Sequence, residues 1–397
     1  MYTSLQMNSR IDPMHGCAMA GIIAFACSIK DALPIVHGPT GCAGGYRLVP
    51  LLCDKEPLLP TTAIYQYELV MGTADKLKNA LYKAHQIYQP KYIFVTLTCA
   101  TSMSGEDYSL IAKQFEADTG TKTFILDGSA LFGEESDGYA ESYRQFVSAL
   151  NLNTHPEPGY VALDGLSPAS FGAINAFWQI SDVLTRECGL AIAPSISVDF
   201  DAAEAGEYAK AHVLPVGQLF HLNGLDRPLL APVGIKGTFD FMQKACALAE
   251  APLPLEAAER YERLLGDFSR ACEPVRTAFC GKAAMVEADG FYAYWLARFL
   301  HDELQMEVFV STDEKGIQIL ERENFCKTIY ADMGGYELDW ECGQKNCVLA
   351  FGSTNLNPRG KGNRIYIPYS SPCWDDISEY PTYFGYDGAF ELLVRIK

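Results

Sequence analysis

Apolar residues along this chain alternate between short continuous runs and longer stretches with helical spacing. The runs at 32–36, 91–97 and 121–126 are rich in β-branched and aromatic residues, which predicts buried strands. Around them, apolar residues recur with the period of a helix, and we expect helices at 18–28, 68–85, 107–116 and 138–150. A strand–helix–strand progression of this kind predicts a mainly parallel sheet covered by helices.

The same plan recurs twice further along the chain. A polar segment with two prolines, 151–159, reads as a linker. After it we expect strands at 160–163 and 189–197, and helices at 171–188, 203–211, 239–249 with Thr238 as N-cap, and 255–272. A third unit is predicted to hold strands at 282–287, 306–310, 347–351 and 364–368, and a helix at 291–304. The pattern therefore predicts an α/β protein of three stacked doubly wound domains with mainly parallel sheets: 1–155, 156–275 and 276–397.

Length, composition and charge limit the class of protein. A chain of 397 residues is too long for one core, and 49% hydrophobic with 20% charged residues is a folded, water-soluble composition. The formal charge of −18 argues against nucleic acid and anionic membrane as partners. No run approaches 18 apolar residues, and the polar first ten residues do not resemble a signal peptide. With thirteen cysteines, an odd number, we expect a reducing, cytoplasmic compartment.

Three cysteines carry the candidate chemistry: Cys17, Cys42 and Cys99. The first two follow a glycine, and Cys99 comes directly after the predicted strand at 91–97, at the strand end where α/β sheets bind ligands. The glycine-rich segment 37–45 is predicted to be a tight loop, and 99–105 a loop as well. Three thiols in such positions are typical of ligands to an iron–sulfur cluster, which usually needs at least four, so a second subunit would supply the rest. Buried structural cysteines are the alternative.

The residues around these cysteines resemble the N-terminal domain of nitrogenase component 1 subunits. Further segments extend the resemblance over nearly the whole chain and occur in the family's order. The matching segments are Gly16-Cys17-Ala18, Ile29-Lys30-Asp31, 37–42 (HGPTGC), 70–77 (VMGTADKL), Thr98-Cys99, Gly105-Glu106-Asp107, 231–238 (APVGIKGT), Glu259-Arg260, Gly281-Lys282 and 383–389 (YFGYDGA).

The resemblance implies a fold of three α/β domains and a core of two homologous subunits, as a heterodimer, heterotetramer or homodimer. Cys17, Cys42 and Cys99 would hold an iron–sulfur cluster at the subunit interface, either P-cluster-like (8Fe–7S) or 4Fe–4S. This cluster would receive electrons from an ATP-dependent iron protein. The chain contains no phosphate-binding loop of the G-x-x-x-x-G-K-[ST] type, so nucleotide chemistry would reside on that partner.

Two departures from the family pattern bear on the reaction. Nitrogenase α-type subunits hold their active-site cofactor with a second-domain cysteine and the histidine of an HGYDG element. Here Phe384 stands at the histidine position, and the segment 211–217 has no cysteine. We therefore do not expect this chain to hold a FeMo-type cofactor by that pair, or to reduce dinitrogen itself.

Three functions fit this combination. The first is a subunit of the catalytic component of a nitrogenase-like reductase, such as a methylthio-alkane reductase. The second is a subunit of a tetrapyrrole reductase, of the nickel-sirohydrochlorin or protochlorophyllide type. The third is a non-catalytic scaffold on which a nitrogenase cofactor is assembled.

Other residues are weaker candidates. His212 and His221 lie near the missing cysteine and could face a cavity, and Cys373 could contact a cluster or substrate. The basic residues Arg359, Lys361 and Arg364 could bind an anion, although a solvated loop is the simpler interpretation. Cys27 and Cys53 are reserve candidates as ligands. The remaining cysteines lie on or beside apolar segments and are most simply structural: Cys188, Cys246, Cys272, Cys280, Cys326, Cys342 and Cys347.

Overall fold

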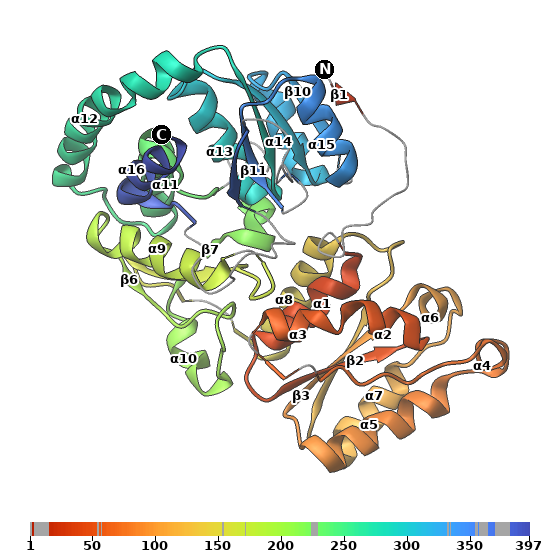
Figure 1. Cartoon of the computed structure of the whole chain (residues 1–397). Helices are drawn as coiled ribbons and strands as arrows, with labels where there is room; N and C mark the ends of the chain where they lie inside the picture. The colour runs from red at the N-terminus through yellow and green to blue at the C-terminus, as the bar shows by residue number, and fades with distance from the viewer. Residues whose placement is uncertain are drawn as a thin grey trace.

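A computed structural model of the chain contains three units, each built on a parallel sheet (Figure 1). It describes residues 2–3, 16–53, 55–56, 58–152, 155–170, 172–223, 229–331, 333, 335–353, 356, 364–369 and 382–397. In the described part of the chain, all strand pairs within the sheets are parallel, as the alternation of strands and helices predicted. Among the described residues, no helix is both long and apolar enough to cross a bilayer.

The first unit is a three-stranded sheet in the order β2-β3-β4. Its strands are paired in register, so that His37 lies beside Leu97 and Leu97 beside Asp127 at one edge. The elements of this unit are α1 (Ala18–Cys27), β2 (Ala32–His37), α2 (Thr40–Tyr46), α3 (Leu48–Leu52), α4 (Gln66–Met71), α5 (Ala74–Tyr88), β3 (Tyr92–Leu97), α6 (Cys99–Met103), α7 (Ser109–Thr119), β4 (Lys122–Asp127) and α8 (Glu135–Ala149).

Three local predictions in this unit are wrong. The single helix expected at 68–85 is two helices, because Gly72 adopts a φ of 107° that ends α4 before α5 begins. The segment expected as a glycine-rich loop at 37–45 contains helix α2, and the loop expected at 99–105 begins with helix α6. Cys42 and Cys99 therefore lie in first helical turns.

Helices α1 and α8 cross with almost no space between their backbones. A methyl group added at Gly21 of α1 would overlap the carbonyl oxygen of Glu135, and one at Gly138 of α8 would overlap that of Ala18. Every residue of α1 is buried in the core of the unit, which includes the aromatic cluster of Phe25, Tyr139 and Phe146. Two glycines thus set the depth at which α1 is held against α8.

The second unit is a sheet in the order β6-β5-β7, with the carboxylate of Asp164 buried at the end of β5. Asp164 accepts hydrogen bonds from Tyr208 (2.6 Å) and from Tyr143 of α8 (3.1 Å), and so ties the first unit to the second. The elements are β5 (Tyr160–Asp164), α9 (Ala173–Arg186), β6 (Ala191–Ile192), η1 (Ala202–Glu204), α10 (Ala205–Tyr208), β7 (His212–Pro215), η2 (Gly217–Asn223), α11 (Gly234–Leu248) and α12 (Leu255–Phe279).

The third unit is a sheet in the order β1-β10-β9-β8-β11-β12. Strand order reverses between β9 and β11 on either side of β8, which is the doubly wound arrangement. Strand β1, which the pattern did not predict, adds to its edge beside β10. The elements are β1 (Tyr2–Thr3), β8 (Ala283–Glu287), α13 (Gly290–Asp302), β9 (Glu307–Thr312), α14 (Glu314–Glu323), β10 (Thr328–Ala331), α15 (Gly335–Gln344), β11 (Leu349–Gly352), β12 (Ile365–Pro368) and α16 (Gly385–Ile396).

The domain boundaries at 155 and 275 stay a prediction, although two features bear on them. The position 275 falls inside α12, a continuous helix from the second unit to the third. One apolar core also extends across both units, from Val161 to Ile396.

The start of helix α11 is built differently from the prediction. Thr238 is not its N-cap: the helix begins at Gly234, and the Thr238 hydroxyl donates to the carbonyl oxygens of Gly234 (2.6 Å) and Pro232 (3.2 Å). The carboxylate of Glu303 caps the helix instead, accepting from the amide of Lys236 at 3.3 Å. A methyl group at Gly234 would lie 2.7 Å from Glu303 Oε1, which explains the glycine at a φ of 76°.

Glu303 should make stability depend on pH. Burial raises the pKa of Glu303 to about 7, from an ordinary 4.5, so the folded chain binds this proton more tightly than the unfolded chain. Its contribution to stability is therefore complete below about pH 4.5 and is lost as pH rises towards 7, a change of about 3 kcal/mol. Urea unfolding of the wild type and of Glu303→Gln at several pH values measures this term, and we expect the variant to lack that part of the decline.

The control is Glu262→Gln, which removes an exposed carboxylate of α12 and should retain the wild-type decline. An unchanged decline in the Glu303 variant would contradict the assignment.

Candidate functional site: three cysteines at the first sheet

Each of the three predicted cysteines lies at the start of a helix. Cys17 is the N-cap of α1, Cys42 is the third residue of α2 and Cys99 is the first residue of α6. Backbone amides in a first helical turn have no acceptor within the helix, and they favour negative charge nearby.

The topology of the sheet brings the three helix starts to one edge. Helices α2 and α6 follow β2 and β3, which are parallel neighbours, so Cys42 and Cys99 lie beyond the same ends of the sheet. Cys17 is held there from the other side: it forms an antiparallel bridge with Glu134, which precedes α8. The amides of Ala18 and Met19 donate to the carbonyls of Gly133 (3.0 Å) and Gly128 (3.1 Å) in the loop after β4.

The three thiols are close enough to interact electrostatically. Burial raises the pKa of the Cys42 thiol, and the neighbouring Cys99 and Cys17 raise it further. Cys17 and Cys42 are half-buried and Cys99 is exposed, so the group opens to the surface on one side. Across the described segments, no three His, Cys, Asp or Glu side chains have the spacing that holds a single metal ion. The donor set nevertheless fits an iron–sulfur cluster, because three soft thiol ligands converge and one side is left for further ligands.

Two glycines and a tyrosine fix this arrangement. A methyl group at Gly16 would lie 2.8 Å from the ring of Tyr46, and one at Gly38 would overlap the side chain of Thr98. The Tyr46 hydroxyl lies 3.1 Å from the Cys17 amide, which donates to it, and 3.2 Å from Cys17 Sγ. Tyr46 was missed by sequence reasoning, since only the helical form of α2 directs it back to Cys17.

A buried hydrogen-bond network underlies two of the cysteine-bearing turns. His37, the last residue of β2, is completely buried; its Nδ1 lies 3.1 Å from Thr62 Oγ1 and its Nε2 lies 3.1 Å from Thr73 Oγ1. The Thr73 hydroxyl donates to Glu106, and Tyr108 donates to the same carboxylate at 2.9 Å. The sequence pointed to His37 and Glu106 only as members of family motifs, without a role.

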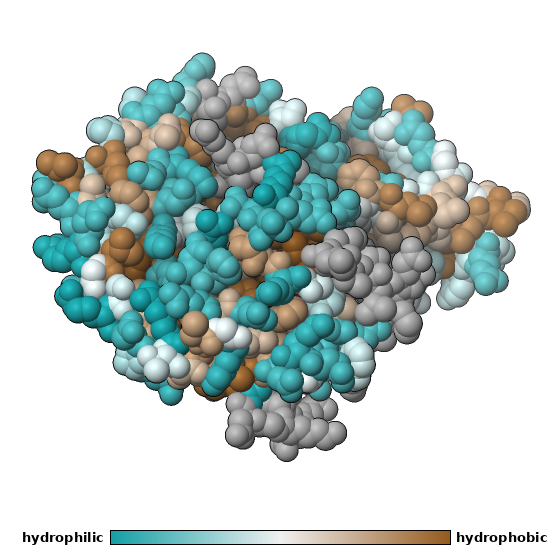
Figure 2. All heavy atoms as spheres, turned by 90° about the horizontal axis from the view of Figure 1, so that it is seen from above, coloured by the Kyte–Doolittle hydropathy of each residue, from teal (hydrophilic) through white to brown (hydrophobic). Residues whose placement is uncertain are grey.

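Several large apolar side chains of the first unit are exposed. Val70 and Met71 at the end of α4 are 84% and 81% exposed, and Met103 at the end of α6 is 73% exposed. Helix α4 lies at the tip of a projecting arm (Figure 1), and Figure 2 shows a hydrophobic surface on that projection. The arm is braced from inside by Lys76, which bonds Glu68 (2.7 Å) and the Ala63 carbonyl (2.8 Å).

Most of the chain matches one known protein family. Residues 17–397 match the family described as nitrogenase component 1 type oxidoreductase. The chain belongs to this family. The match begins at Cys17 and includes all three cysteines of the site.

Individual relatives include catalytic and biosynthetic proteins. The nitrogenase iron-molybdenum cofactor biosynthesis protein NifE of Sinorhizobium fredii is 24% identical over 404 residues, covering 96% of this chain and 80% of that protein. The nitrogenase molybdenum-iron protein alpha chain of Methanosarcina barkeri is 23% identical over 344 residues, covering 78% of this chain and 61% of that protein. A solved structure of nitrogenase Cp1 at pH 6.5 has a TM-score of 0.78 at 18% identity, covering 98% of this chain and 93% of that chain. That likeness confirms the predicted fold class.

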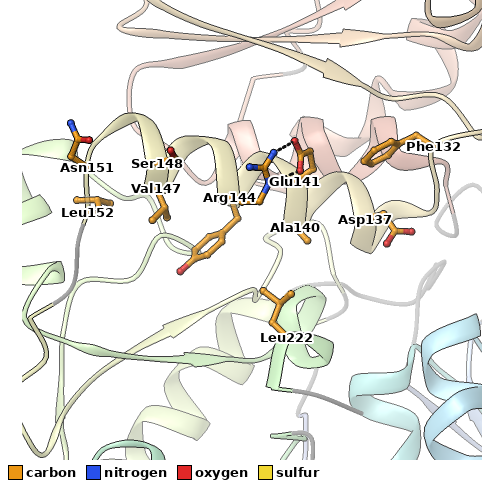
Figure 3. A pocket seen from close by; sticks show the side chains of 11 residues that line it. Phe132, Asp137, Ala140, Glu141, Arg144, Val147, Ser148, Asn151, Leu152 and Leu222 are labelled. Carbon is orange, nitrogen blue, oxygen red and sulfur yellow. Dashed lines mark hydrogen bonds and ion pairs between the residues drawn. The ribbon is translucent and has the colours of Figure 1, made fainter.

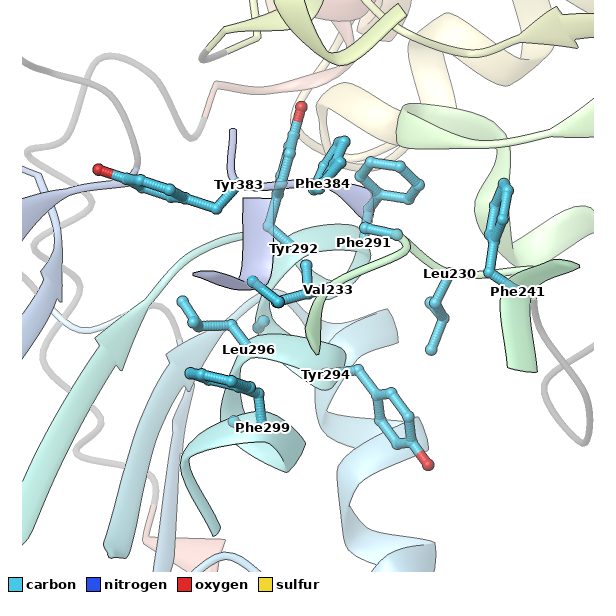
Figure 4. Packing of buried hydrophobic residues seen from close by; sticks show 14 of the residues in the cluster. Leu230, Val233, Phe241, Phe291, Tyr292, Tyr294, Leu296, Phe299, Tyr383 and Phe384 are labelled. Carbon is cyan, nitrogen blue, oxygen red and sulfur yellow. The ribbon is translucent and has the colours of Figure 1, made fainter. Parts of the chain in front are cut away.

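Phe384, at the family's histidine position, belongs to the apolar core. It is 3% exposed, and its ring stacks on Tyr292 with centroids 5.8 Å apart and meets Phe291 edge-on at 6.2 Å (Figure 4). Its amide donates to Gln179 at 3.0 Å, and its backbone bridges Val233. Phe384 is therefore part of the aromatic packing and offers no side-chain atom that could bind a metal.

The histidines predicted near the second sheet are not joined to each other by any described contact. His221 lies where the three units meet; burial first, and then the charge of Lys315, lower its pKa to about 4. Among the described residues, His221 Nδ1 and His212 Nε2 are buried and have no hydrogen-bond partner. Beside His221, Lys315 of α14 forms an ion pair with Asp137 of α8 at 2.7 Å and links the first unit to the third.

A groove of about 580 Å³ lies along α8, between the first unit and η2 (Figure 3). Its polar side chains include an ion pair between Arg144 and Glu141 (2.5 Å). Other residues that line it are Phe132, Asp137, Tyr143 and Leu222. The three cysteines do not line this groove.

The other candidate residues have structural surroundings or lie outside the described part of the chain. Six buried cysteines lie in neighbouring pairs, in which one thiol raises the pKa of the other: Cys27 beside Cys53, Cys188 beside Cys246, and Cys342 beside Cys347. Cys27 and Cys53 thus contact each other in the core of the first unit. Arg364 forms an ion pair with Asp339 at 2.9 Å. Cys373, Arg359 and Lys361 fall outside the described residues.

Proposed function

We propose that the chain is one subunit of a component 1 type complex in which Cys17, Cys42 and Cys99 hold an iron–sulfur cluster shared with a homologous subunit. The observation that carries the proposal is the convergence of three partly exposed thiols at the edge of the first sheet. A P-cluster-like centre would take three cysteines from each of two subunits. A 4Fe–4S centre would take these three cysteines and a fourth ligand from the partner subunit.

When bound, such a cluster accepts and donates electrons one at a time. The residues of this chain would hold it and set its surroundings. The Tyr46 hydroxyl touches the Cys17 sulfur, and hydrogen bonds to ligand sulfurs are a main control of reduction potential.

The missing ligands would come from a second subunit that covers the open side. Val70, Met71 and Met103 expose apolar surface on the first unit, as interfaces between subunits do. The arm that carries Val70 and Met71 is braced by the ion pair of Lys76 with Glu68. The partner is proposed to be a component 1 homologue, in a heterodimer, heterotetramer or homodimer.

For the reaction, the leading proposal is the catalytic component of a nitrogenase-like reductase, such as a methylthio-alkane reductase, acting in the cytoplasm with an ATP-dependent iron protein. A cluster held by the three cysteines would relay electrons from that protein. At the position of the family's histidine ligand, this chain has Phe384, which cannot bind a metal. All cysteines in the described part of the chain are free, which agrees with a reducing compartment.

A second candidate is a scaffold for cofactor assembly. It is favoured by the relative of Sinorhizobium fredii, which aligns with 96% of this chain and is named as a cofactor biosynthesis protein. A scaffold would release its metal to an acceptor protein and would not turn over with ATP.

The test is anaerobic purification with the native partner, followed by iron and sulfide counting and by turnover assays with an iron protein and ATP. About eight iron atoms per interface would indicate a P-cluster-like centre, and about four a 4Fe–4S centre of the tetrapyrrole reductase type. ATP-dependent reduction of a substrate supports the reductase. Transfer of iron to an acceptor without turnover supports the scaffold, and a complex without iron contradicts both.

A further inference from the structure

The turns that carry Cys42 and Cys99 meet at one residue, His37. The His37 carbonyl accepts from the Thr101 hydroxyl at 2.7 Å and from the Thr98 amide at 3.3 Å, on either side of Cys99. The next residue, Gly38, packs against the Thr98 side chain and begins the turn that leads to Cys42. The position of the His37 backbone therefore fixes the distance between these two cysteine-bearing turns.

The side chain of His37 is fixed by hydrogen bonds at both ring nitrogens. Glu106 accepts from the Thr73 hydroxyl, so the Thr73 oxygen must itself accept from His37 Nε2–H. Burial lowers the pKa of His37 to about 4, opposed by the charge of Glu106, so the ring is neutral and Nδ1 accepts from the Thr62 hydroxyl. Thr62 in turn accepts from the Gly38 amide at 3.1 Å. Every polar atom of the ring has one defined partner.

We propose that His37 is a positioning residue for the three-cysteine site: anchored through Thr73 to Glu106, it sets the spacing of Cys42 and Cys99. The chain of contacts runs from the half-exposed Glu106 through Thr73 to the buried imidazole and then to Gly38. Tyr108 closes it from the side, with its ring edge-on to His37 at 4.8 Å. The inference rests on the proposed function only in taking iron as the natural ligand.

The experiment measures thiol spacing in the full-length chain, freed of iron under anaerobic conditions. The probe is phenylarsine oxide, which bridges two neighbouring thiols. The variant Cys42→Ser reports binding by the buried thiol pairs and is subtracted as background. His37→Ala should weaken the Cys42-dependent affinity by about 10- to 100-fold, as loss of an outer-shell partner does at metal sites. Thr73→Val should act in the same direction, and His37→Gln, which retains a donor and an acceptor, should restore part of the affinity.

The matched control is His85→Ala. His85 is a half-buried histidine of the same unit, bonded through Nδ1 to Thr121 at 2.9 Å and packed on Phe115. Its loss should lower stability without changing arsenical affinity by more than about twofold. Circular dichroism establishes whether each variant is folded. If His37→Ala does not fold, the arsenical affinities of Thr73→Val and His37→Gln test the role of His37 instead.

The proposal is overturned if folded His37→Ala, or Thr73→Val in its absence, binds the arsenical as tightly as the wild type. In complexes isolated with iron, the same variants should lose iron to a chelator faster by a similar factor. A wild-type complex without iron would refute the proposed function, whereas the arsenical titration would still decide the role of His37.

Discussion

Replacing Cys42 by serine should remove most of the iron from the complex. Cys42 is half-buried and lies near both other thiols, and serine offers a hard oxygen that soft iron–sulfur sites bind poorly. We expect an iron content at least about tenfold lower than in the wild type, and weaker association with the partner, because the cluster would form part of the interface. Iron analysis and size-exclusion chromatography under anaerobic conditions measure both.

Cys17→Ser and Cys99→Ser should behave in the same way. The matched control is Cys280→Ser, because Cys280 is exposed like Cys99 but lies at the end of α12, 3.6 Å from the Gln305 side chain. This control should keep its iron. If all three site variants retained wild-type iron, the three cysteines would not be ligands. They would then be structural cysteines, which is the alternative given in the sequence analysis.

The second large effect concerns the contact between α1 and α8. A methyl group at Gly138 has no space, because the Ala18 carbonyl lies where it would be placed. Gly138→Ala should therefore force the helices apart and destabilise the chain by roughly 3 kcal/mol, at the upper end for overpacked cores. Since α1 begins at Cys17, iron content should fall as well. Urea unfolding and iron analysis on the same preparation test the two effects together.

Gly343→Ala provides the comparison, because it changes a glycine inside helix α15 with no neighbouring atom within 4 Å of the added methyl group. Removing a glycine from an open helical position should leave stability unchanged or raise it by about 0.5–1 kcal/mol. Equal unfolding free energies for the two variants would show that α1 and α8 can separate without cost.

The elements that the sequence predicted well are those in which burial is complete. Strands β2, β3, β8 and β9 are continuous apolar runs because both faces of a parallel sheet are covered, and such runs are visible without tertiary information. The single helix predicted at 68–85 is wrong because the apolar spacing continues through Gly72. The positive φ of Gly72 ends α4, and the spacing of apolar residues does not show it. Helices α2 and α6 were missed because five to seven residues are too few to show a period.

The candidate site was predictable in its ligands but not in its supports. Cys17, Cys42 and Cys99 are marked by adjacent glycines and strand ends, which any reader of the sequence can find. Tyr46 and Thr73 also follow glycines, but their roles arise from contacts over 29 and 36 positions of the chain, which no local pattern shows. For the same reason the pairing of Cys27 with Cys53 could not be foreseen, and both were reserve ligand candidates.

Helix α12 has a mechanical consequence for the whole molecule. Its 25 residues form a continuous helix about 38 Å long that leads from the second unit to the third, and its buried residues belong to one apolar core shared by both units. These two units should therefore move as a single body. The first unit is joined to that body by an apolar cluster that includes Phe146 and Phe200, and by polar links such as Lys315 with Asp137 and Tyr143 with Asp164. Any movement of the three cysteines relative to the other two units would therefore have to disturb this packing along α8.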